Sequence, residues 1–415
     1  MTGTAFLAIL LLLGGTFLAV PIAIVLAVVV LLVEVVRSVW ARFGLTRVTY
    51  ERQLGRDRMT FGEEIPLAIE VWNRKRLPLA WLRAEDEASR GVIVRERTLV
   101  IGGQGGQVLR NAWTLAPFER VTRQFHLAAE RRGVYELGPV SLSVGDLFAR
   151  EAAAAPLSSI DRFLVRPRTV PTGAFHRRDT LGGEARARVG LSEDPSRFAG
   201  VREYQPGDPL RRIHARASAR VGRPVVKRFE PSRDREVLIA LDVQTSAAPI
   251  WETDEDSDEA EGLFVVAASI ARSLAVEKAA FGLAAAGYHG AESRYAMLAV
   301  SEAPGQLERV LDLLARLSAR PTASFDRLLA LVLRVVRPGT TVVVVTARDP
   351  GPYLASLRRL ERAGCPVVVV ACGPEAVADA GRARRAGLAA RSARLDGPWR
   401  TAGHLAMDAG IGTTR

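Results

Sequence analysis

An uncharged stretch at the amino terminus constrains this chain more than any other feature. From Thr2 to Val33 there are 32 residues without a charged side chain, about 48 Å of α-helix at about 1.5 Å per residue. A single bilayer crossing needs about 20 apolar residues. The run is therefore too long for one upright span and short for two ordinary ones. Gly14, Gly15 and Pro21 favour a break into a tight helical hairpin, and one long tilted helix is the alternative.

The charges after this stretch predict its orientation. Four arginines follow it closely: Arg37, Arg42, Arg47 and Arg52. Basic residues beside a membrane segment favour the cytoplasmic side. A cleaved signal peptide, the alternative, has a basic start and a short apolar region of about 7–15 residues, and neither is present. We therefore expect residues 1–40 to be transmembrane and the remainder to face the cytoplasm.

The overall charge gives little support for a nucleic-acid partner. The net charge is +12, but 54 of the 57 basic residues are arginine, which suggests a coding bias. A basic protein beside a membrane is also attracted to the anionic inner leaflet. The two cysteines, Cys365 and Cys372, are expected to be reduced structural thiols, as is usual in the cytoplasm.

Residues 45–167 contain short runs separated by turn signals. In Ile65–Trp72 the apolar residues occupy every second position, which is typical of a half-buried strand. Four further runs are of the same kind: Leu79–Arg83, Gly91–Ile101, Gln107–Leu115 and Val121–Leu127. Gly102–Gly106 is interpreted as a hairpin loop, because no lysine of a phosphate-binding loop follows it. The pattern predicts a β-sandwich of about seven strands.

Residues 235–415 follow a different pattern. Three apolar runs rich in β-branched residues are typical of parallel strands covered on both faces: Val237–Leu241, Val342–Val345 and Val367–Ala371. Four helical stretches alternate with them: Leu263–Val276, Gln306–Leu317, Phe325–Val336 and Tyr353–Ala363. The alternation predicts a doubly wound α/β sheet, whose ligands bind beyond the carboxyl ends of the strands.

Between these regions, residues 168–234 form a signature segment and linker with a Pro206-Gly207-Asp208 turn and a run of arginines. Together with the start of the α/β region, this segment closely resembles the signature of the bacterial family called domain of unknown function 58. The matching residues are Phe198, Gly200, Arg202, Tyr204, Pro206, Gly207, Asp208, Arg212, Ile213, Ser218, Ala219, Arg220, Lys227 and Asp242. Arg131–Pro139 is similar to an upstream segment of the family. Ala215 departs from it, because relatives usually carry tryptophan there.

The resemblance implies an architecture and a partner. It implies that the second half of the chain is a von Willebrand A-like domain. With the apolar amino terminus and the strand pattern, the expected architecture is a membrane helix or helical hairpin, a β-sandwich and a von Willebrand A-like doubly wound α/β domain, held at the bacterial inner membrane. Relatives are commonly associated with MoxR-type AAA+ ATPases, so the implied function is that of a protein-binding scaffold or adaptor. In the signature segment we expect six partner-binding residues: Arg202, Tyr204, Asp208, Arg212, His214 and Arg220.

The von Willebrand A likeness also implies a cation site. Such domains often hold a divalent cation through an Asp-x-Ser-x-Ser loop, a later threonine and a later aspartate. The corresponding ligands for Mg²⁺ or Mn²⁺ are Asp242, Ser246, Thr322 and Asp349, with Ser324 as an alternate hydroxyl. Hard cations prefer such oxygen donors. Gln244 departs from the loop pattern, and Arg348 offers Asp349 an ion pair instead of a metal. The alternative is that Asp242 and Ser246 only accept hydrogen bonds from backbone amides.

The sequence displays no enzyme signature of the nucleophile-elbow, zinc-protease or Walker type. His214 is interpreted as a packing or hydrogen-bonding residue and not as a general base. The acidic stretch Trp251–Glu261 is expected to be a solvated loop beside Asp242. We therefore expect a binding protein and no enzyme, with a structural envelope-assembly protein or an uncharacterised hydrolase as the alternatives.

Overall fold

The structure is a computed structural model and describes residues 3–18, 20–102, 106–145, 151–172, 193–205, 213–231, 236–246, 257–290 and 293–408. It divides into two compact units, Met1–Val165 and Arg166–Arg415. Asp208 and Arg212 of the signature, and the acidic residues of 251–256, lie outside the described residues.

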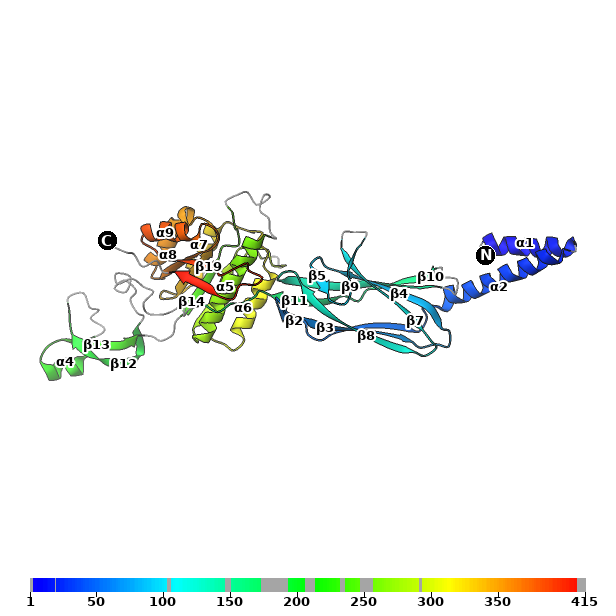
Figure 1. The fold of residues 1–415 in the computed structure, drawn as a ribbon. Coiled ribbons are helices and arrows are strands. Elements are labelled where there is room, and N and C mark those ends of the chain that lie inside the picture. Colours follow the sequence, from blue (N-terminus) through cyan, green and yellow to red (C-terminus); the bar gives the residue numbers. More distant parts are fainter. Residues whose placement is uncertain are drawn as a thin grey trace. The chain divides into compact units, whose positions relative to one another are not determined.

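The first unit begins with two apolar helices, α1 (Gly3–Phe17) and α2 (Pro21–Phe43) (Figure 1). A Cβ atom on Gly15 would lie 3.0 Å from the Cβ of Ala23, so the two helices are in close contact there. The Thr4 hydroxyl donates to Glu34, in the second half of α2. The helices therefore form an antiparallel hairpin, with the break just before Pro21, whose fixed φ suits the start of a helix. Among the described residues, α2 is long and apolar enough to cross a membrane, by length and composition.

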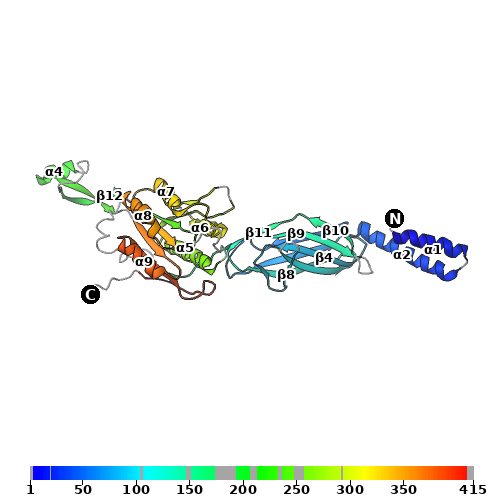
Figure 2. The same cartoon turned by 90° about the horizontal axis from the view of Figure 1, so that it is seen from above.

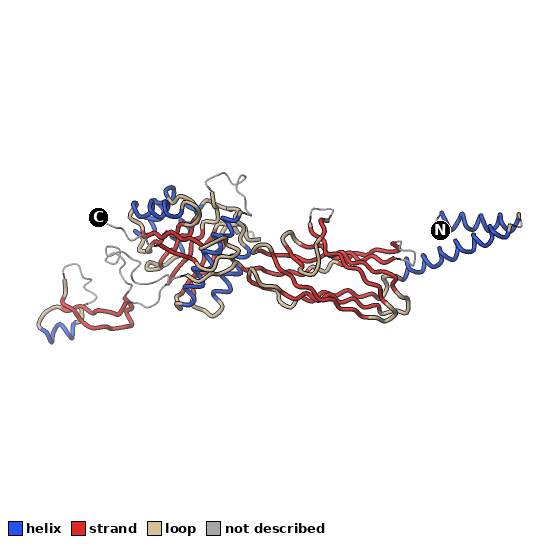
Figure 3. Tube along the Cα trace, viewed as in Figure 1, coloured by secondary structure: helices blue, strands red, loops and turns tan. Residues whose placement is uncertain are grey.

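Two antiparallel sheets make up the rest of the first unit (Figure 3). The smaller sheet has the order β1 (Val48–Leu54), β3 (Ile65–Asn73), β8 (Arg120–Ala129) and β5 (Val92–Val94). The larger sheet has the order β2 (Arg58–Thr60), β11 (Asp161–Arg166), β9 (Gly133–Gly145), β4 (Leu79–Ala88), β7 (Gln107–Leu115) and β6 (Val100–Ile101), with β10 (Glu151–Leu157) beside β9. The two sheets enclose one core.

The apolar side chains alternate along the strands as the sequence predicts. Ile65, Leu67 and Ile69 of β3 are fully buried and share a core with Leu82 and Leu109 of the larger sheet. The predicted hairpin pairing is also present, because Gly102 donates to the Gly106 carbonyl at 2.8 Å and β6 pairs with β7. Residues 103–105 of the glycine-rich loop lie outside the described residues. The expected number of strands, about seven, was too low. The region has eleven described strands, since β2 and β6 are too short to show a period and Gly138-Pro139 interrupts the pattern of β9.

A buried ion pair joins the two sheets across this core. Arg52 Nη1 of β1 lies 2.8 Å from Asp86 Oδ1 of β4, and the two side chains are 1% and 0% exposed. Arg52 also contacts Asp161 at 2.8 Å and donates to the Ser159 carbonyl at 2.6 Å, while the Tyr50 hydroxyl donates to Asp86. Burial raises the pKa of Asp86, and the hydrogen bond from Tyr50 and the Arg52 guanidinium oppose that rise. The cluster is therefore stable only when it is complete.

Replacing Arg52 alone should destabilise the sandwich. Arg52→Met leaves the Asp86 carboxylate buried without a counter-charge, so we expect the free energy of unfolding to fall by about 3–5 kcal/mol. The combined variant Tyr50→Phe/Arg52→Met/Asp86→Leu should recover most of that loss, because it removes the charges together with the need to pair them. Chemical unfolding of the full chain in detergent, followed by tryptophan fluorescence, measures both. A combined variant as unstable as Arg52→Met would contradict this role of the pair.

Lys75 gives the sandwich a pH-dependent stability. Its side chain is 8% exposed, and its Nζ has no hydrogen-bond partner in the described part of the chain. Burial lowers the pKa of Lys75 from 10.5 to about 8. Between these values the unfolded chain holds the proton more tightly than the folded chain, so the free energy of unfolding rises as the pH rises from 8 to 10.5.

Lys75→Met should remove this rise. Relative to the wild type, the variant is expected to be more stable at pH 7 by about 1–3 kcal/mol and to lose that advantage above pH 10. Subtracting the free energy of unfolding of the wild type from that of the variant at each pH removes the contribution of the other groups that titrate in this range. A difference that is constant with pH would show that the ammonium is well solvated in the folded chain.

The second unit is built on a seven-stranded sheet with the order β16-β15-β14-β17-β18-β19-β20. The strands are β14 (Glu236–Leu241), β15 (Ala280–Ala285), β16 (Ala296–Ser301), β17 (Thr341–Thr346), β18 (Val367–Ala371), β19 (Ala389–Leu395) and β20 (Leu405–Asp408). The five inner strands are parallel, whereas β16 and β20 pair antiparallel at the edges. The sequence predicted three of the inner strands and missed β15 and β19, whose alanines weaken the apolar signal.

Helices cover both faces of this sheet (Figure 2). α7 (Phe325–Val335), α8 (Leu354–Arg362) and α9 (Ala376–Arg385) share a core with Leu238 and Ala240 of β14. α5 (Asp258–Val276) and α6 (Gln306–Arg316) lie on the opposite face, where Ile239 and Leu241 are buried. The unit is thus a layered α/β structure.

The prediction that the acidic stretch Trp251–Glu261 is a loop is wrong for its last four residues, which belong to α5. Asp258, Glu259 and Glu261 form the first turn of α5, and Ser257 Oγ caps the helix by accepting from the Ala260 amide at 3.2 Å. Carboxylates stabilise a helix at this end because they oppose the positive end of the helix dipole. The helix therefore begins five residues earlier than the sequence pattern indicated, and it takes over the end of the acidic stretch.

Candidate functional site

Asp242 lies at the carboxyl edge of the parallel sheet, directly after β14. Because β14 pairs with β15 and β17 in parallel, the segments that follow these strands meet at one edge. They enclose a cavity of about 10 Å³, the lower limit for one water molecule. The cavity is lined by Leu241, Asp242, Val243, Gln244, Ala286, Pro321, Ala323, Phe325 and Arg348. The site is therefore closed and well packed.

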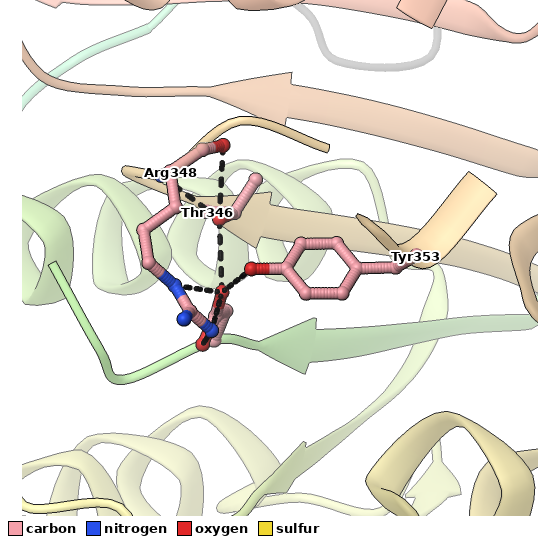
Figure 4. A network of polar contacts seen from close by, with 4 residues as sticks. Thr346, Arg348 and Tyr353 are labelled. Carbon is pink, nitrogen blue, oxygen red and sulfur yellow. Dashed lines mark hydrogen bonds and ion pairs between the residues drawn. The ribbon is translucent and has the colours of Figure 1, made fainter. Parts of the chain in front are cut away.

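A set of donors converges on the Asp242 carboxylate, which is 3% exposed (Figure 4). Arg348 Nη2 lies 2.9 Å from Oδ1 and 2.8 Å from Oδ2, and Arg348 Nε lies 3.0 Å from Oδ2. The Thr346 hydroxyl donates to Oδ2 at 3.0 Å, and the Tyr353 hydroxyl donates to it at 3.3 Å. Both carboxylate oxygens are thus occupied by donors from the protein itself.

The fold places each donor without help from a ligand. The Asp242 amide donates to the Val345 carbonyl at 2.9 Å, which sets the end of β14 beside the end of β17, where Thr346 stands. The Arg348 amide donates back to Thr346 Oγ1 at 3.1 Å. The Tyr353 ring packs edge-on against Phe325, with 5.2 Å between the ring centroids. These contacts fix the cluster from three elements.

Burial and charge act against each other in this cluster. Burial raises the pKa of Asp242, and the Arg348 guanidinium and its hydrogen bonds pull that pKa down. The pKa of Tyr353 is also raised, first by burial and then by the neighbouring Asp242 carboxylate, so the phenol remains a donor. Since the Arg348 side chain stays cationic, its charge and that of the Asp242 carboxylate cancel. Both oxygens of that carboxylate also accept hydrogen bonds.

The structure brings only part of the expected metal-ligand set into this cluster. The Thr322 hydroxyl donates to the Arg294 carbonyl instead, although its neighbours Pro321 and Ala323 line the cavity. Asp349 Oδ1 lies 2.9 Å from Arg382 Nε of α9 and accepts from the Gly351 amide at 3.0 Å. Gln244 and Ser246 are half-buried in the loop after β14.

Arg348 pairs with Asp242 and not with its sequence neighbour Asp349, which corrects the pairing that the sequence suggested. A guanidinium therefore stands where a cation bound to Asp242 would have to be. In the described ranges, no group of three or more His, Cys, Asp or Glu side chains is arranged to hold a metal ion. As they are arranged, these residues do not fit Mg²⁺ or Mn²⁺.

Sequence reasoning missed Thr346 and Tyr353 and assigned Arg348 to the wrong carboxylate. A signal for the correct pairing exists in the topology. Leu241 of β14 is opposite Val345 of β17, so the residues that follow these two strands must be neighbours. The position of Tyr353, at the entry to α8, depends on packing against Phe325 and has no such signal.

The signature segment forms a small antiparallel hairpin of its own, β12 (Glu193–Glu203) and β13 (Val225–Pro231), with the short helix α4 (Ala215–Val221) between them. His214 Nδ1 accepts from the Ala217 amide at 3.3 Å and so caps α4. The Tyr204 amide donates to the Pro224 carbonyl at 3.0 Å, and Arg202 donates to the carbonyl of Glu203 at 3.0 Å. Arg220 is exposed in the last turn of α4, and Ala215 is exposed in its first.

Titration with a divalent cation tests the closed site. We expect no saturable binding of Mg²⁺ or Mn²⁺ by the wild-type chain, because Arg348 occupies both Asp242 oxygens. Arg348→Ala should open the carboxylate and bind the cation, and binding should raise the melting temperature of that variant by mass action. Asp242→Asn/Arg348→Ala is the matched control. Isothermal titration calorimetry measures these three chains and Asp242→Asn alone, and saturable binding by the wild type that is lost in Asp242→Asn would overturn this assignment.

Comparison with known proteins identifies similarity in the same region. The model of a family described as protein of unknown function DUF58 matches residues 200–369, from the signature hairpin to β18. The uncharacterized protein YeaD of Bacillus subtilis is 25% identical over 252 residues, which is 60% of this chain and 58% of that protein. The chain therefore spans little more than half the length of this relative.

Similarities to solved structures are weak. Alpha-2-macroglobulin of Escherichia coli, from domain MG7 to its carboxyl terminus, matches 29% of this chain and 17% of that chain, with 21% identity and a TM-score of 0.21. A cohesin module of Clostridium perfringens matches 28% of this chain and 97% of that chain, with 10% identity and a TM-score of 0.21. Values this low do not indicate a shared fold.

Proposed function

We propose that this chain is a membrane-anchored scaffold or adaptor that binds a protein partner through the carboxyl edge of its α/β unit. The observation that carries the proposal is the Asp242–Arg348 pair. With Thr346 and Tyr353 it forms a hydrogen-bonded polar cluster beside a cavity of about 10 Å³, at the edge of the sheet where such folds place their ligands. A preorganised face of this kind suits recognition of a protein surface.

The unit itself is proposed to be a von Willebrand A-like binding domain. Five parallel inner strands, antiparallel edge strands and helices on both faces support this assignment. So does Asp242, which follows the parallel strand β14 as the first aspartate of a cation-binding loop would. The similarity of residues 200–369 to the DUF58 family model is a separate line of support.

Membrane anchoring is supported by α2 and by the arginines that follow it. Arg42 and Arg47 lie at and just after the carboxyl end of α2, where basic residues favour the cytoplasmic side. We therefore propose that both units face the cytoplasm at a bacterial inner membrane. The family resemblance makes a MoxR-type AAA+ ATPase the proposed partner.

Recognition at this face is proposed to use arginine in place of a metal. Arg348 binds Asp242 through Nε and Nη2, and its Nη1 forms no hydrogen bond with the described residues while the side chain stays 15% exposed. A guanidinium has five donors in a fixed plane and suits a carboxylate. An acidic side chain of the partner would bind at the free Nη1, so binding would need no cation.

Charge substitutions at Gln244 test this face, because Gln244 lines the same cavity as Arg348. Gln244→Glu should repel a partner carboxylate and weaken binding about tenfold or more, whereas Gln244→Lys should leave it intact or strengthen it. Biolayer interferometry of the full chain in nanodiscs, with a MoxR-type ATPase of the same organism, measures both. Glu308→Gln in the first turn of α6, whose neighbour Gln306 bonds the amino end of β15, is the control on the opposite edge.

The outcomes separate the two parts of the proposal. If the wild-type chain does not bind the ATPase, this partner is excluded. If the chain binds but Gln244→Glu and Gln244→Lys have the same affinity, the carboxyl edge is not the binding face.

A further inference from the structure

One end of the β-sandwich is fastened to the segment that follows α2. The Arg74 amide donates to the Arg47 carbonyl at 2.9 Å, and the Asn73 amide donates to the Glu119 carbonyl at 2.9 Å. The Phe118 amide in turn donates to the Lys75 carbonyl at 3.3 Å. The loop between β3 and β4 and the loop between β7 and β8 are thus tied to each other and to residues 44–47. Four residues reach at most about 14 Å, so these loops stay close to the end of α2.

This end carries exposed arginines without counter-charges. Arg47, Arg74 and Arg76 are exposed, and none of them forms an ion pair with any described residue. The guanidinium of Arg74 lies over the Trp72 ring, 3.8 Å from its centroid. Among the described carboxylates nearby, Glu70 pairs with Arg120 at 2.5 Å, and Glu119 accepts from the Ala116 amide at 2.6 Å but keeps its charge, so the three arginines face one uncompensated carboxylate. A net positive surface results.

An apolar ring projects from the same loops. Phe118 is 60% exposed, and its φ of 61° lies in the left-handed region that bulky residues disfavour. The hydrogen bond to Lys75 holds the loop in this conformation. An exposed aromatic side chain among arginines is the combination found where proteins contact the interface of a bilayer.

We propose that this basic–aromatic end, made of Arg47, Trp72, Arg74, Arg76 and Phe118, docks on the anionic leaflet of the membrane that α2 crosses. The arginines would bind headgroup phosphates, and the Phe118 ring would insert between headgroups. The inference rests on the proposed membrane anchoring, because α2 supplies the tether that keeps the weak surface contacts at high local concentration. Docking would hold the sandwich against the membrane in one orientation.

A fluorophore at position 118 tests the proposal in the full chain. Phe118→Cys can be labelled selectively, since Cys365 and Cys372 are buried and burial raises the pKa of the Cys372 thiol to about 12. The protein is reconstituted into phosphatidylcholine vesicles with or without phosphatidylglycerol. Nitroxides carried on the lipid headgroups then report whether the label touches the bilayer.

Ile101→Cys is the matched control, because Ile101 is 81% exposed and lies at the opposite end of the sandwich. It pairs with Gln107, the first residue of β7, whereas Leu115 at the other end of β7 adjoins the proposed docking loop. We expect strong quenching at position 118 and little at position 101 in the anionic vesicles. Arg47→Gln/Arg74→Gln/Arg76→Gln should lower the ratio of docked to free sandwich about 100-fold.

Each result has a distinct meaning. A chain that does not float with the vesicles refutes the membrane anchoring on which the inference rests. A chain that floats but shows equal quenching at positions 118 and 101 refutes the docking alone. Strong quenching that persists in pure phosphatidylcholine, or in the triple arginine variant, refutes the role of anionic headgroups.

Discussion

Asp242 is a carboxylate with almost no access to water, and the carboxyl edge of the α/β unit depends on how that charge is compensated. A buried charge is tolerated only with a partner and with its hydrogen-bonding capacity filled. Arg348, Thr346 and Tyr353 meet both conditions. They come from the end of β17, the loop after it and the start of α8. The neutralised carboxylate therefore also fixes where the loop after β14, the loop after β17 and α8 meet. A divalent ion would have served the same electrostatic purpose.

The β-sandwich solves a similar problem in its own core. Asp86 is buried and paired with Arg52, and a tyrosine hydroxyl again completes the set of donors. There the pair joins β1, the edge strand of the smaller sheet, to β4 of the larger sheet. The two pairs differ in exposure: Arg52 is 1% exposed and has a structural task, whereas Arg348 is 15% exposed and keeps Nη1 for the proposed partner.

Much of the fold could be predicted because its signals are local. Alternation in Ile65–Trp72 and the valine runs of β17 and β18 depend only on which faces of a strand are buried. The alanine-rich β15 and β19 were missed because small residues give little contrast between faces. The start of α5 was missed because an acidic stretch is polar whether it is a loop or a first helical turn.

The site was harder to predict than the fold. Asp242 could be found from its place after a buried strand, but the residue that pairs with it is decided by strand order. Arg348 is next to Asp349 in the sequence and next to Asp242 in space, since β14 and β17 are neighbours that lie about a hundred residues apart. The position of Tyr353 depends on its packing against Phe325, and a single sequence gives no signal for that contact.

Under the proposed membrane anchoring, the helical hairpin at the amino terminus has a consequence for how the chain would enter a bilayer. Because α1 runs back along α2, Thr4 and Glu34 meet, and a polar segment adjoining α1 would stay on the same side as the sandwich. Residues 18–20, which link the two helices in the sequence, are uncharged. Insertion of the hairpin would then carry no hydrophilic segment through the hydrocarbon core. The energetic barrier to insertion would be that of burying an apolar helix pair that enters from the side of the membrane on which the sandwich lies.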